Sequence, residues 1–237
     1  MANFVKLLNV LLEALPYLHK TILFNFKYFK IKTALRFPVL FLSKSTVHLK
    51  GECRINSDGI HFGMITIGKN YKTNRPNHGV FINLKKGGIL VFNGTANIGR
   101  NSSIEVGEKG ILSLGDNLVM TYGALIYAYH YVCIGNNCRI GWDTVIMDTA
   151  FHALTFEDGS KTKGYAPVVI GNYVWIPSFC RVMAGAKVPD YIVFGSGSYI
   201  SKDFSHIPPK SLLAGNPLTI KKKNIYRDTT DDLIEYK

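Results

Sequence analysis

His152 is the residue of this chain whose type and position best suit catalysis. It opens the polar stretch 152–167 and lies two residues after Ala150. An imidazole can serve as a general base near neutral pH, although a single histidine is often only structural. Asp148 could orient the ring, as a carboxylate does in a catalytic dyad. Because four extended residues span about 13 Å, this pairing requires the chain to fold back at a corner.

Other residues compete for the same two roles. Asp143, Glu157 and Asp158 are alternative carboxylate partners for the base. His130, which lies between two tyrosines, is the alternative base. The remaining histidines have no supporting context, so we predict His152 as the base and Asp148 as its partner.

A repeat of six residues predicts the elements that position this histidine. From residue 170 to 204, a large apolar residue recurs at every sixth position: Ile170, Ile176, Val182, Val188, Phe194 and Ile200. This period fits neither a helix nor a simple strand. It fits a chain that turns a corner every six residues, so that three faces close a coil of 18 residues. Val188 then stacks on Ile170, Phe194 on Ile176 and Ile200 on Val182. We further expect Gly171 and Gly195 to supply a positive φ at the corners.

The same repeat divides the chain into parts. It begins near Val47, is irregular at first, contains a loop at 69–79 and becomes regular from Ile134. It breaks at 152–167, resumes at Ile170 and ends at Phe204. A fixed internal period is typical of a solenoid, and an excursion from a regular solenoid is often functional. We predict an all-β solenoid over 47–204 with a protruding loop at 152–167, and a C-terminal tail over 205–237, either a short helix or disordered.

The segment 1–46 has a different composition. Apolar residues at helical spacing predict an amphipathic helix over 3–15, which Pro16 ends. Residues 17–42 mix aromatic residues with lysines. One interpretation is a cap over the first coil, because the open end of a solenoid must be covered. The other is a segment that lies on an anionic membrane surface, and both can hold together.

Charge and cysteine usage narrow the functional classes. The 237-residue chain has a net charge of +12, of which residues 1–50 carry +7 with eight basic residues against Glu13 alone. This indicates an anionic partner, which we take to be a phosphorylated ligand or a membrane rather than nucleic acid. The four cysteines have no metal-site spacing, so we expect no bound metal. Reduced thiols fit the cytoplasm, either free or at the inner face of the membrane. The apolar stretch Phe4–Leu15 is too short to span a bilayer and lacks the features of a signal peptide.

Residues 134–222 resemble the hexapeptide-repeat acyltransferases, in the branch of the galactoside, maltose and polysaccharide O-acetyltransferases. The matching pieces are IGNNCRIGWDTVIMDTAFH, the excursion, VVIGNYVWIPSFCRVMAGAKVPD, FGSGSYISKD, IPP and AGNP followed by Lys. The resemblance implies a left-handed parallel β-helix, a homotrimer, and acetyl-CoA bound between neighbouring subunits. It also implies that His152 is the base for direct transfer, without a covalent enzyme intermediate.

The resemblance also implies a set of CoA-binding positions: Trp175, Ser178, Ala184, Ser196, Ser201, Lys202, Lys221 and Lys222. Lysine ammonium groups suit the phosphates of CoA, and small residues allow a ligand to approach closely. The run Lys221–Lys223 has a simpler interpretation as a solvated charge cluster, and Trp175 as cover for an outer face. Pro177 departs from the pattern, because family members usually have glycine there.

These observations favour an acetyl-CoA-dependent O-acetyltransferase acting on a sugar or polysaccharide precursor. An N-acetyltransferase of an amino sugar is the close alternative, since the same base serves both acceptors. A non-catalytic scaffold is an alternative of another class, in which His152 is dispensable. A γ-type carbonic anhydrase would need three zinc-binding histidines, and only His130 and His152 lie in the plausible region.

Overall fold

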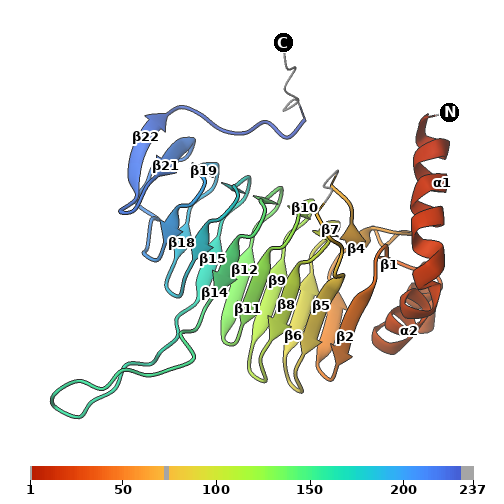
Figure 1. Ribbon diagram of the computed structural model, residues 1–237, viewed down its shortest axis with the longest axis horizontal. Coiled ribbons are helices and arrows are strands. Elements are labelled where there is room, and N and C mark those ends of the chain that lie inside the picture. The colour runs from red at the N-terminus through yellow and green to blue at the C-terminus, as the bar shows by residue number, and fades with distance from the viewer. Residues whose placement is uncertain (1, 72–74, 231–237) are drawn as a thin grey trace.

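The chain forms a β-helix with a helical cap at one end and a C-terminal hairpin at the other (Figure 1). The computed structural model describes residues 2–71 and 75–230, with side chains from Leu8 onward. The cap consists of α1 (Ala2–Ala14), a short 3-10 turn at Leu15–Tyr17, α2 (Leu18–Tyr28) and α3 (Ile31–Ala34). The amphipathic helix predicted over 3–15 therefore corresponds to α1, while the aromatic segment that follows it contains two further helices.

Three parallel sheets form the faces of the coil. The first contains β1 (Val39–Phe41), β4 (Ile65–Lys69), β7 (Ala96–Gly99), β10 (Leu118–Met120), β13 (Arg139–Ile140), β16 (Trp175–Ile176), β19 (Ile192–Phe194), β21 (Ser211–Ala214) and β22 (Thr219–Lys223). The second contains β2 (Ser45–Leu49), β5 (Val80–Leu84), β8 (Ser103–Val106), β11 (Leu125–Ala128), β14 (Val145–Met147), β17 (Arg181–Val182) and β20 (Tyr199–Ile200). The third contains β3 (Glu52–Ile55), β6 (Ile89–Phe92), β9 (Ile111–Leu114), β12 (Tyr131–Ile134), β15 (Val168–Ile170) and β18 (Lys187–Val188).

The register of the strands confirms the predicted stacking in the regular part. Ile170 pairs with Val188, and Val182 pairs with Ile200. Such columns of buried aliphatic side chains run the length of the solenoid and form its core. The fold is the predicted left-handed parallel β-helix of hexapeptide repeats. The slips in the earlier repeat reflect longer coils, because Ile98 pairs with Met120 and Met120 with Ile140, 22 and 20 residues apart instead of 18.

The corner glycines have a different role from the one expected of them. Gly171 and Gly195 do not have a positive φ; instead Tyr173 and Gly197, two residues further on, have φ values of 56° and 74°. Gly171 is required by close packing between coils, since a Cβ there would lie 2.4 Å from the Asp190 carboxylate and 2.8 Å from its backbone nitrogen. The glycine pattern of the repeat thus marks close contact between successive coils.

The first strand begins at Val39, eight residues before the predicted start of the repeat near Val47. As an edge strand, β1 would otherwise leave backbone groups without partners. Side chains of α2 supply them: the Val39 amide donates to Asn25 Oδ1 at 3.2 Å, and the Phe41 amide donates to Thr21 Oγ1 at 3.1 Å. Phe24 packs against Phe41 with ring centroids 5.6 Å apart. Thus α2 covers the open end of the solenoid.

The C-terminal segment differs from the expected helix or disordered tail. β21 continues the first sheet beside β19, and β22 turns back antiparallel to β21. The chain then runs back across the first sheet, where Arg227 lies over Trp175 with 4.6 Å between the guanidinium carbon and the ring centroid. Residues 231–237 lie outside the described residues.

Candidate active site

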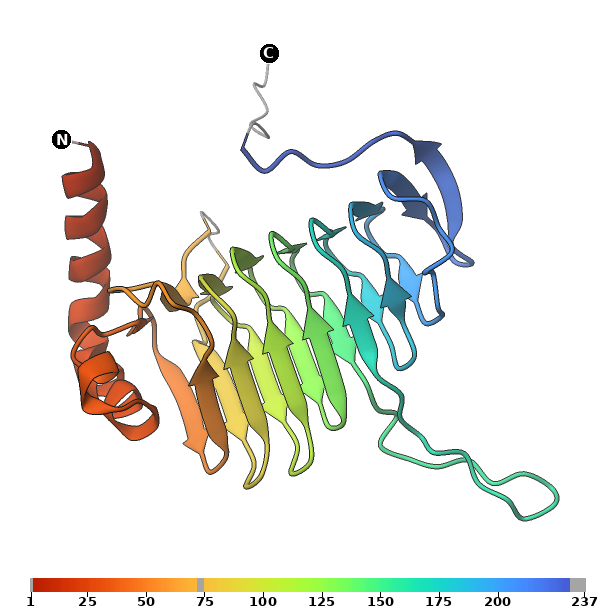
Figure 2. The same cartoon turned by 180° about the vertical axis from the view of Figure 1, so that it is seen from behind.

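The predicted excursion is an arm that leaves the corner between the second and third sheets (Figures 1 and 2). It connects β14 to β15, and its two sides hydrogen-bond to each other in antiparallel fashion. The Ala150 amide donates to the Gly164 carbonyl at 2.8 Å, and the Phe156 amide donates to the Ser160 carbonyl at 2.8 Å. A regular hairpin-like arm therefore interrupts the solenoid where the sequence predicted a loop.

His152 lies on this arm, close to the body of the solenoid, and is exposed. The preceding residue, Phe151, adopts a left-handed backbone with a φ of 60°. The Phe151 ring stacks edge-on against Tyr129, with ring centroids 4.9 Å apart. This contact fixes the root of the arm directly before His152.

Asp148 is completely buried at the foot of the arm. Its carboxylate accepts hydrogen bonds from two consecutive backbone amides of the preceding coil, Tyr129 at 2.9 Å and His130 at 2.7 Å. Both oxygens thus hold the corner at 129–130. This geometry gives Asp148 a positioning role for the corner below the arm.

The alternative residues are also placed by the structure. Asp143 forms an ion pair of 2.7 Å with Arg75, and Asp158 accepts from the backbone amide of Ser160 near the tip of the arm. His130 is exposed, and its ring lies against Tyr165 of the arm with centroids 4.9 Å apart. His130 therefore belongs to the foot of the arm, on the same corner as the root of His152.

A pocket of about 270 Å³ lies at the foot of the arm. It is lined by Lys109, Tyr129, His130, Thr149 and Tyr165. Aromatic faces beside a cationic and several polar groups are a suitable surface for a sugar, which has apolar ring faces and many hydroxyls. The sequence pointed to His130 here but not to the three residues that complete the pocket with it and Tyr129.

Next to this pocket is a polar cluster that the sequence analysis did not identify. The Tyr129 hydroxyl accepts a hydrogen bond from Lys85 at 2.9 Å and donates one to Glu105. Burial would raise the pKa of Glu105, but hydrogen bonds from Tyr129 and Asn83 and the charge of Lys85 outweigh it and lower that pKa. Its members are one coil apart in the irregular part of the repeat, so a strict period of 18 does not reveal their proximity.

The predicted CoA-binding positions fall at two corners of the solenoid and on the first sheet. Ser178 and Ser196 follow β16 and β19, at the corner between the first and second sheets; the Gly197 amide donates to the Ser178 carbonyl at 3.0 Å. Ala184, Ser201 and Lys202 follow β17 and β20, at the corner from which the arm leaves. These two groups lie at opposite edges of the second sheet.

The arm and the second of these groups are directly connected. The Gly185 amide, next to Ala184, donates to the Pro167 carbonyl at the end of the arm at 3.2 Å. One coil further on, the Lys187 amide donates to the Lys202 carbonyl at 3.2 Å. The structure therefore brings the root of the arm, Ala184 and Lys202 onto one corner.

The other predicted positions lie on the first sheet. Trp175 points outward beside Arg139, which precedes it in the sheet, and both line a pocket of about 260 Å³ that Arg227 also lines. Lys221 and Lys222 are exposed on β22. Pro177, where relatives in the family usually have glycine, accepts a hydrogen bond through its carbonyl from the Thr144 hydroxyl at 2.8 Å.

The cysteines behave as packing residues in the described chain. Cys53, Cys138 and Cys180 are buried and Cys133 is partly exposed, and all four are free thiols. Burial raises the pKa of Cys138 to about 12 and that of Cys180 above its usual value. Among the described residues, no group of three or more His, Cys, Asp or Glu side chains is arranged to hold a metal ion.

Comparisons with known proteins agree with the family resemblance. The galactoside O-acetyltransferase of Escherichia coli (strain K12) is 29% identical over 147 residues, which cover 60% of this chain and 70% of that protein. A putative acetyltransferase of Staphylococcus aureus (strain Mu50 / ATCC 700699) is 36% identical over 78 residues, which cover 32% of this chain and 37% of that protein. No family model matches the chain. The relatives confirm the predicted resemblance to hexapeptide-repeat acyltransferases and the predicted class, an acetyltransferase.

Solved structures are similar in fold. The polySia-specific acetyltransferase NeuO is 20% identical, with 81% of this chain and 91% of that chain covered and a TM-score of 0.49. A galactoside acetyltransferase in complex with coenzyme A is 18% identical, with 96% and 87% covered and a TM-score of 0.34. Both structures are related to this chain at the level of fold alone.

Proposed function

We propose that this protein is an acetyl-CoA-dependent O-acetyltransferase that acts on a sugar or polysaccharide precursor. The observation that carries the proposal is the shared corner of the solenoid, where the arm with His152, Ala184 and Lys202 meet in consecutive coils. The named acetyltransferase activity of the sequence relatives supports the chemistry. The proposal includes a cytoplasmic location, which rests on the four free thiols.

The residues of this corner fit a coenzyme A ligand in their chemistry. Lys202, Lys221 and Lys222 are exposed ammonium groups that can pair with phosphates. Ala184 and Gly185 are small, and a Cβ built on Gly185 would have only one neighbour, 3.9 Å away. Ser178, Ser196 and Ser201 offer hydroxyls to the amide-rich arm of the cofactor. When bound, acetyl-CoA supplies the thioester whose acetyl group is transferred.

In this proposal, His152 removes the proton from the acceptor hydroxyl as that oxygen attacks the thioester carbonyl. The C–O bond forms, the C–S bond breaks, and the imidazolium returns its proton to the departing thiolate. Asp148 acts through the corner that it holds, as a positioning residue and not as a direct partner of the imidazole. The pocket at the foot of the arm, with Tyr165 and Lys109, is the proposed acceptor subsite.

The arrangement also supports a site shared between subunits. The two groups of CoA-binding positions lie at opposite edges of one sheet, which a single ligand could use together only across two copies of the chain. The arm has large exposed apolar side chains, Leu154 at 71% and Phe156 at 57%, which in a homotrimer would pack on a neighbour. We include the homotrimer in the proposal for this reason.

The proposal is tested by binding and turnover measured separately. Acetyl-CoA is titrated by calorimetry into the wild type, His152→Ala and the control His61→Ala, which changes an exposed histidine far from the arm. We expect all three to bind alike, and His152→Ala alone to lose about 10²–10⁴-fold in kcat with a sugar acceptor. A folded wild type that does not bind acetyl-CoA would overturn the proposal and favour a scaffold. Transfer to amino groups but not hydroxyls would instead identify an N-acetyltransferase.

A further inference from the structure

The outer surface of the N-terminal cap is unusually apolar. Ten large side chains of the cap helices and their connections have exposed fractions between 40% and 70%: Leu8, Leu11, Leu12, Leu15, Leu18, Ile22, Leu23, Phe26, Ile31 and Leu35. The inner face of the same helices already covers the first coil through Phe24, Thr21 and Asn25. Capping the solenoid therefore leaves this outer surface, which we call the cap face, without a partner in the described chain.

The cap face is continuous and grooved. Leu11, Leu15 and Leu18 line an apolar groove of about 330 Å³ together with Phe37 and Phe62. The ring of Phe26 lies 6.2 Å from that of Phe37, which extends the same surface along α2. Contiguous exposed apolar surfaces of this kind usually mark an interaction site.

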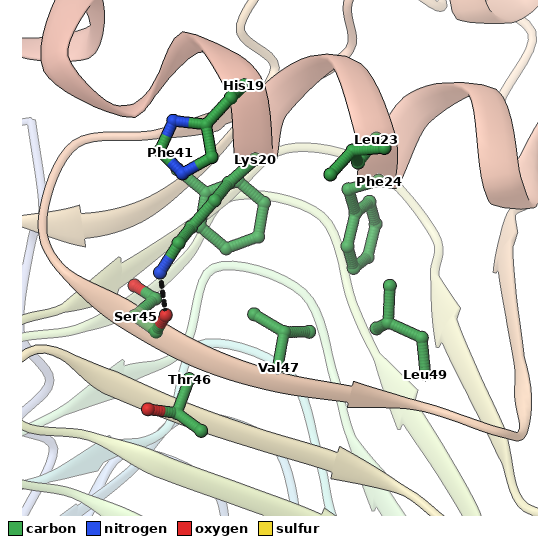
Figure 3. A pocket seen from close by; sticks show the side chains of 9 residues that line it. All are labelled: His19, Lys20, Leu23, Phe24, Phe41, Ser45, Thr46, Val47 and Leu49. Carbon is green, nitrogen blue, oxygen red and sulfur yellow. Dashed lines mark hydrogen bonds between the residues drawn. The ribbon is translucent and has the colours of Figure 1, made fainter.

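A second cavity, of about 410 Å³, opens between α2 and β2 (Figure 3). Its walls include Leu23, Phe24, Val47 and Leu49, whereas the Lys20 ammonium donates a hydrogen bond to the Ser45 carbonyl within it. Figure 3 shows the lysine on the helix side and the two aliphatic residues on the strand below it. The cap therefore combines apolar walls with a cation at this cavity too.

Basic residues are interspersed with the most exposed apolar side chains. Lys27, Lys30, Lys32 and Arg36 are all exposed, and they alternate with Ile31 (70% exposed) and Leu35 (62% exposed). The sequence contains no acidic residue between Glu13 and Glu52. Exposed apolar groups within a one-sign positive surface match the interface of an anionic bilayer, where the apolar groups insert and the cations meet the headgroups.

We propose that the cap face docks on the surface of an anionic phospholipid bilayer. Charge selects this occupant over a second copy of the chain, because residues 1–50 carry a net +7 and two such faces would repel each other. The docking is peripheral, since within the described residues no helix is long and apolar enough to span a bilayer. It places the cap end of the solenoid on the membrane and the arm several coils away from it (Figure 2). This inference does not depend on the proposed enzymatic activity.

Flotation of the full-length protein with lipid vesicles tests this docking. The vesicles contain phosphatidylcholine alone or with 30 mol% phosphatidylglycerol. We expect binding to the anionic vesicles only, weakened by salt. Lys30→Gln/Lys32→Gln removes two cap charges, and each contributes about fivefold, so we expect on the order of 25-fold weaker binding. The control Lys86→Gln/Lys163→Gln removes two exposed charges away from the cap, and we expect less than threefold change.

The double variant Ile31→Ser/Leu35→Ser tests insertion, because both side chains are exposed and their loss leaves the core intact. We expect loss of binding to anionic vesicles with an unchanged melting temperature and an unchanged mass by light scattering. Three results would overturn the proposal: no wild-type binding to anionic vesicles, equal weakening by both charge pairs, or a change of oligomeric mass in the serine variant. The last would identify the cap face as a contact between copies.

Discussion

Asp148 offers the sharpest test of how the foot of the arm is built. Its buried carboxylate accepts two backbone hydrogen bonds, at 2.9 Å from Tyr129 and 2.7 Å from His130. A hydrogen bond to a charged acceptor contributes about 1.5–3 kcal/mol. Asp148→Asn keeps one acceptor and turns an NH₂ group toward the other amide, so we expect about 2 kcal/mol of destabilisation. Asp148→Ala loses both bonds, and we expect about 4 kcal/mol.

The assay is thermal unfolding followed by circular dichroism, together with the transfer rate measured well below the melting temperature. For a chain of this size, 1 kcal/mol corresponds to about 2–4 °C, so we expect roughly 4–8 °C for asparagine and twice that for alanine. Asp158→Asn, a carboxylate at the exposed tip of the arm, is the matched control and should leave the melting temperature unchanged. We expect kcat of Asp148→Asn to fall less than tenfold.

The opposite pattern would refute this reasoning. If Asp148→Asn melts with the wild type but loses about 10²–10⁴-fold in kcat, the carboxylate acts directly on the base. The pH profile of kcat would then also move, because the charge beside the imidazole would be gone. In that case the catalytic dyad predicted from the sequence is correct and the positioning role is wrong.

Three further predictions follow from individual contacts. Thr144→Val removes the hydroxyl that donates to the Pro177 carbonyl at 2.8 Å, so we expect about 1–2 kcal/mol of destabilisation by urea titration; an unchanged midpoint would contradict this. The lowered pKa of Glu105 stabilises the fold above the carboxyl's unfolded pKa, and this is lost as pH falls through the lower, folded pKa. Melting temperatures between pH 6 and pH 3 should therefore fall less in Glu105→Gln than in the wild type, and parallel curves would exclude this contribution. Finally, a thiol reagent should titrate one cysteine, Cys133, in the folded protein and all four in denaturant, because the other three are buried; rapid reaction of a second thiol would show that a buried position opens.

The regular half of the fold could be predicted because each residue there has one task. Where a coil takes 18 residues, the apolar column itself gives the register, as with Ile170 and Val188. The register was not predictable where a coil takes 22 or 20 residues, because the extra residues bulge at corners without an apolar marker. The start of the solenoid was placed late for a related reason. β1 has three buried residues in a row, and its backbone is satisfied by Asn25 and Thr21, a contact that no local pattern announces.

The candidate site shows the same division. His152 could be identified because it opens a break in a regular pattern, which is a feature of the sequence itself. The bonds of Asp148 to the corner at 129–130 join residues 18 and 19 positions apart, in a part of the chain where the repeat slips. The glycines misled for a physical reason: a short distance between coils and a positive φ both favour glycine, and the sequence alone does not distinguish them.

The arrangement of the site follows from the geometry of a three-sided coil. The arm can reach beyond its own corner only by leaving the solenoid, and in doing so it exposes Leu154 and Phe156. Ser178 and Ser196, at the far edge of the second sheet, cannot meet the corner of His152 in the same copy, because several residues of extended chain separate the two edges. Three-fold symmetry would set one edge of each copy against the other edge of its neighbour, with the arm across the junction. We therefore expect Leu154→Asp to lower the oligomeric mass by light scattering and to weaken acetyl-CoA binding at the same time. Loss of mass with unchanged binding would show that the site is complete within one copy.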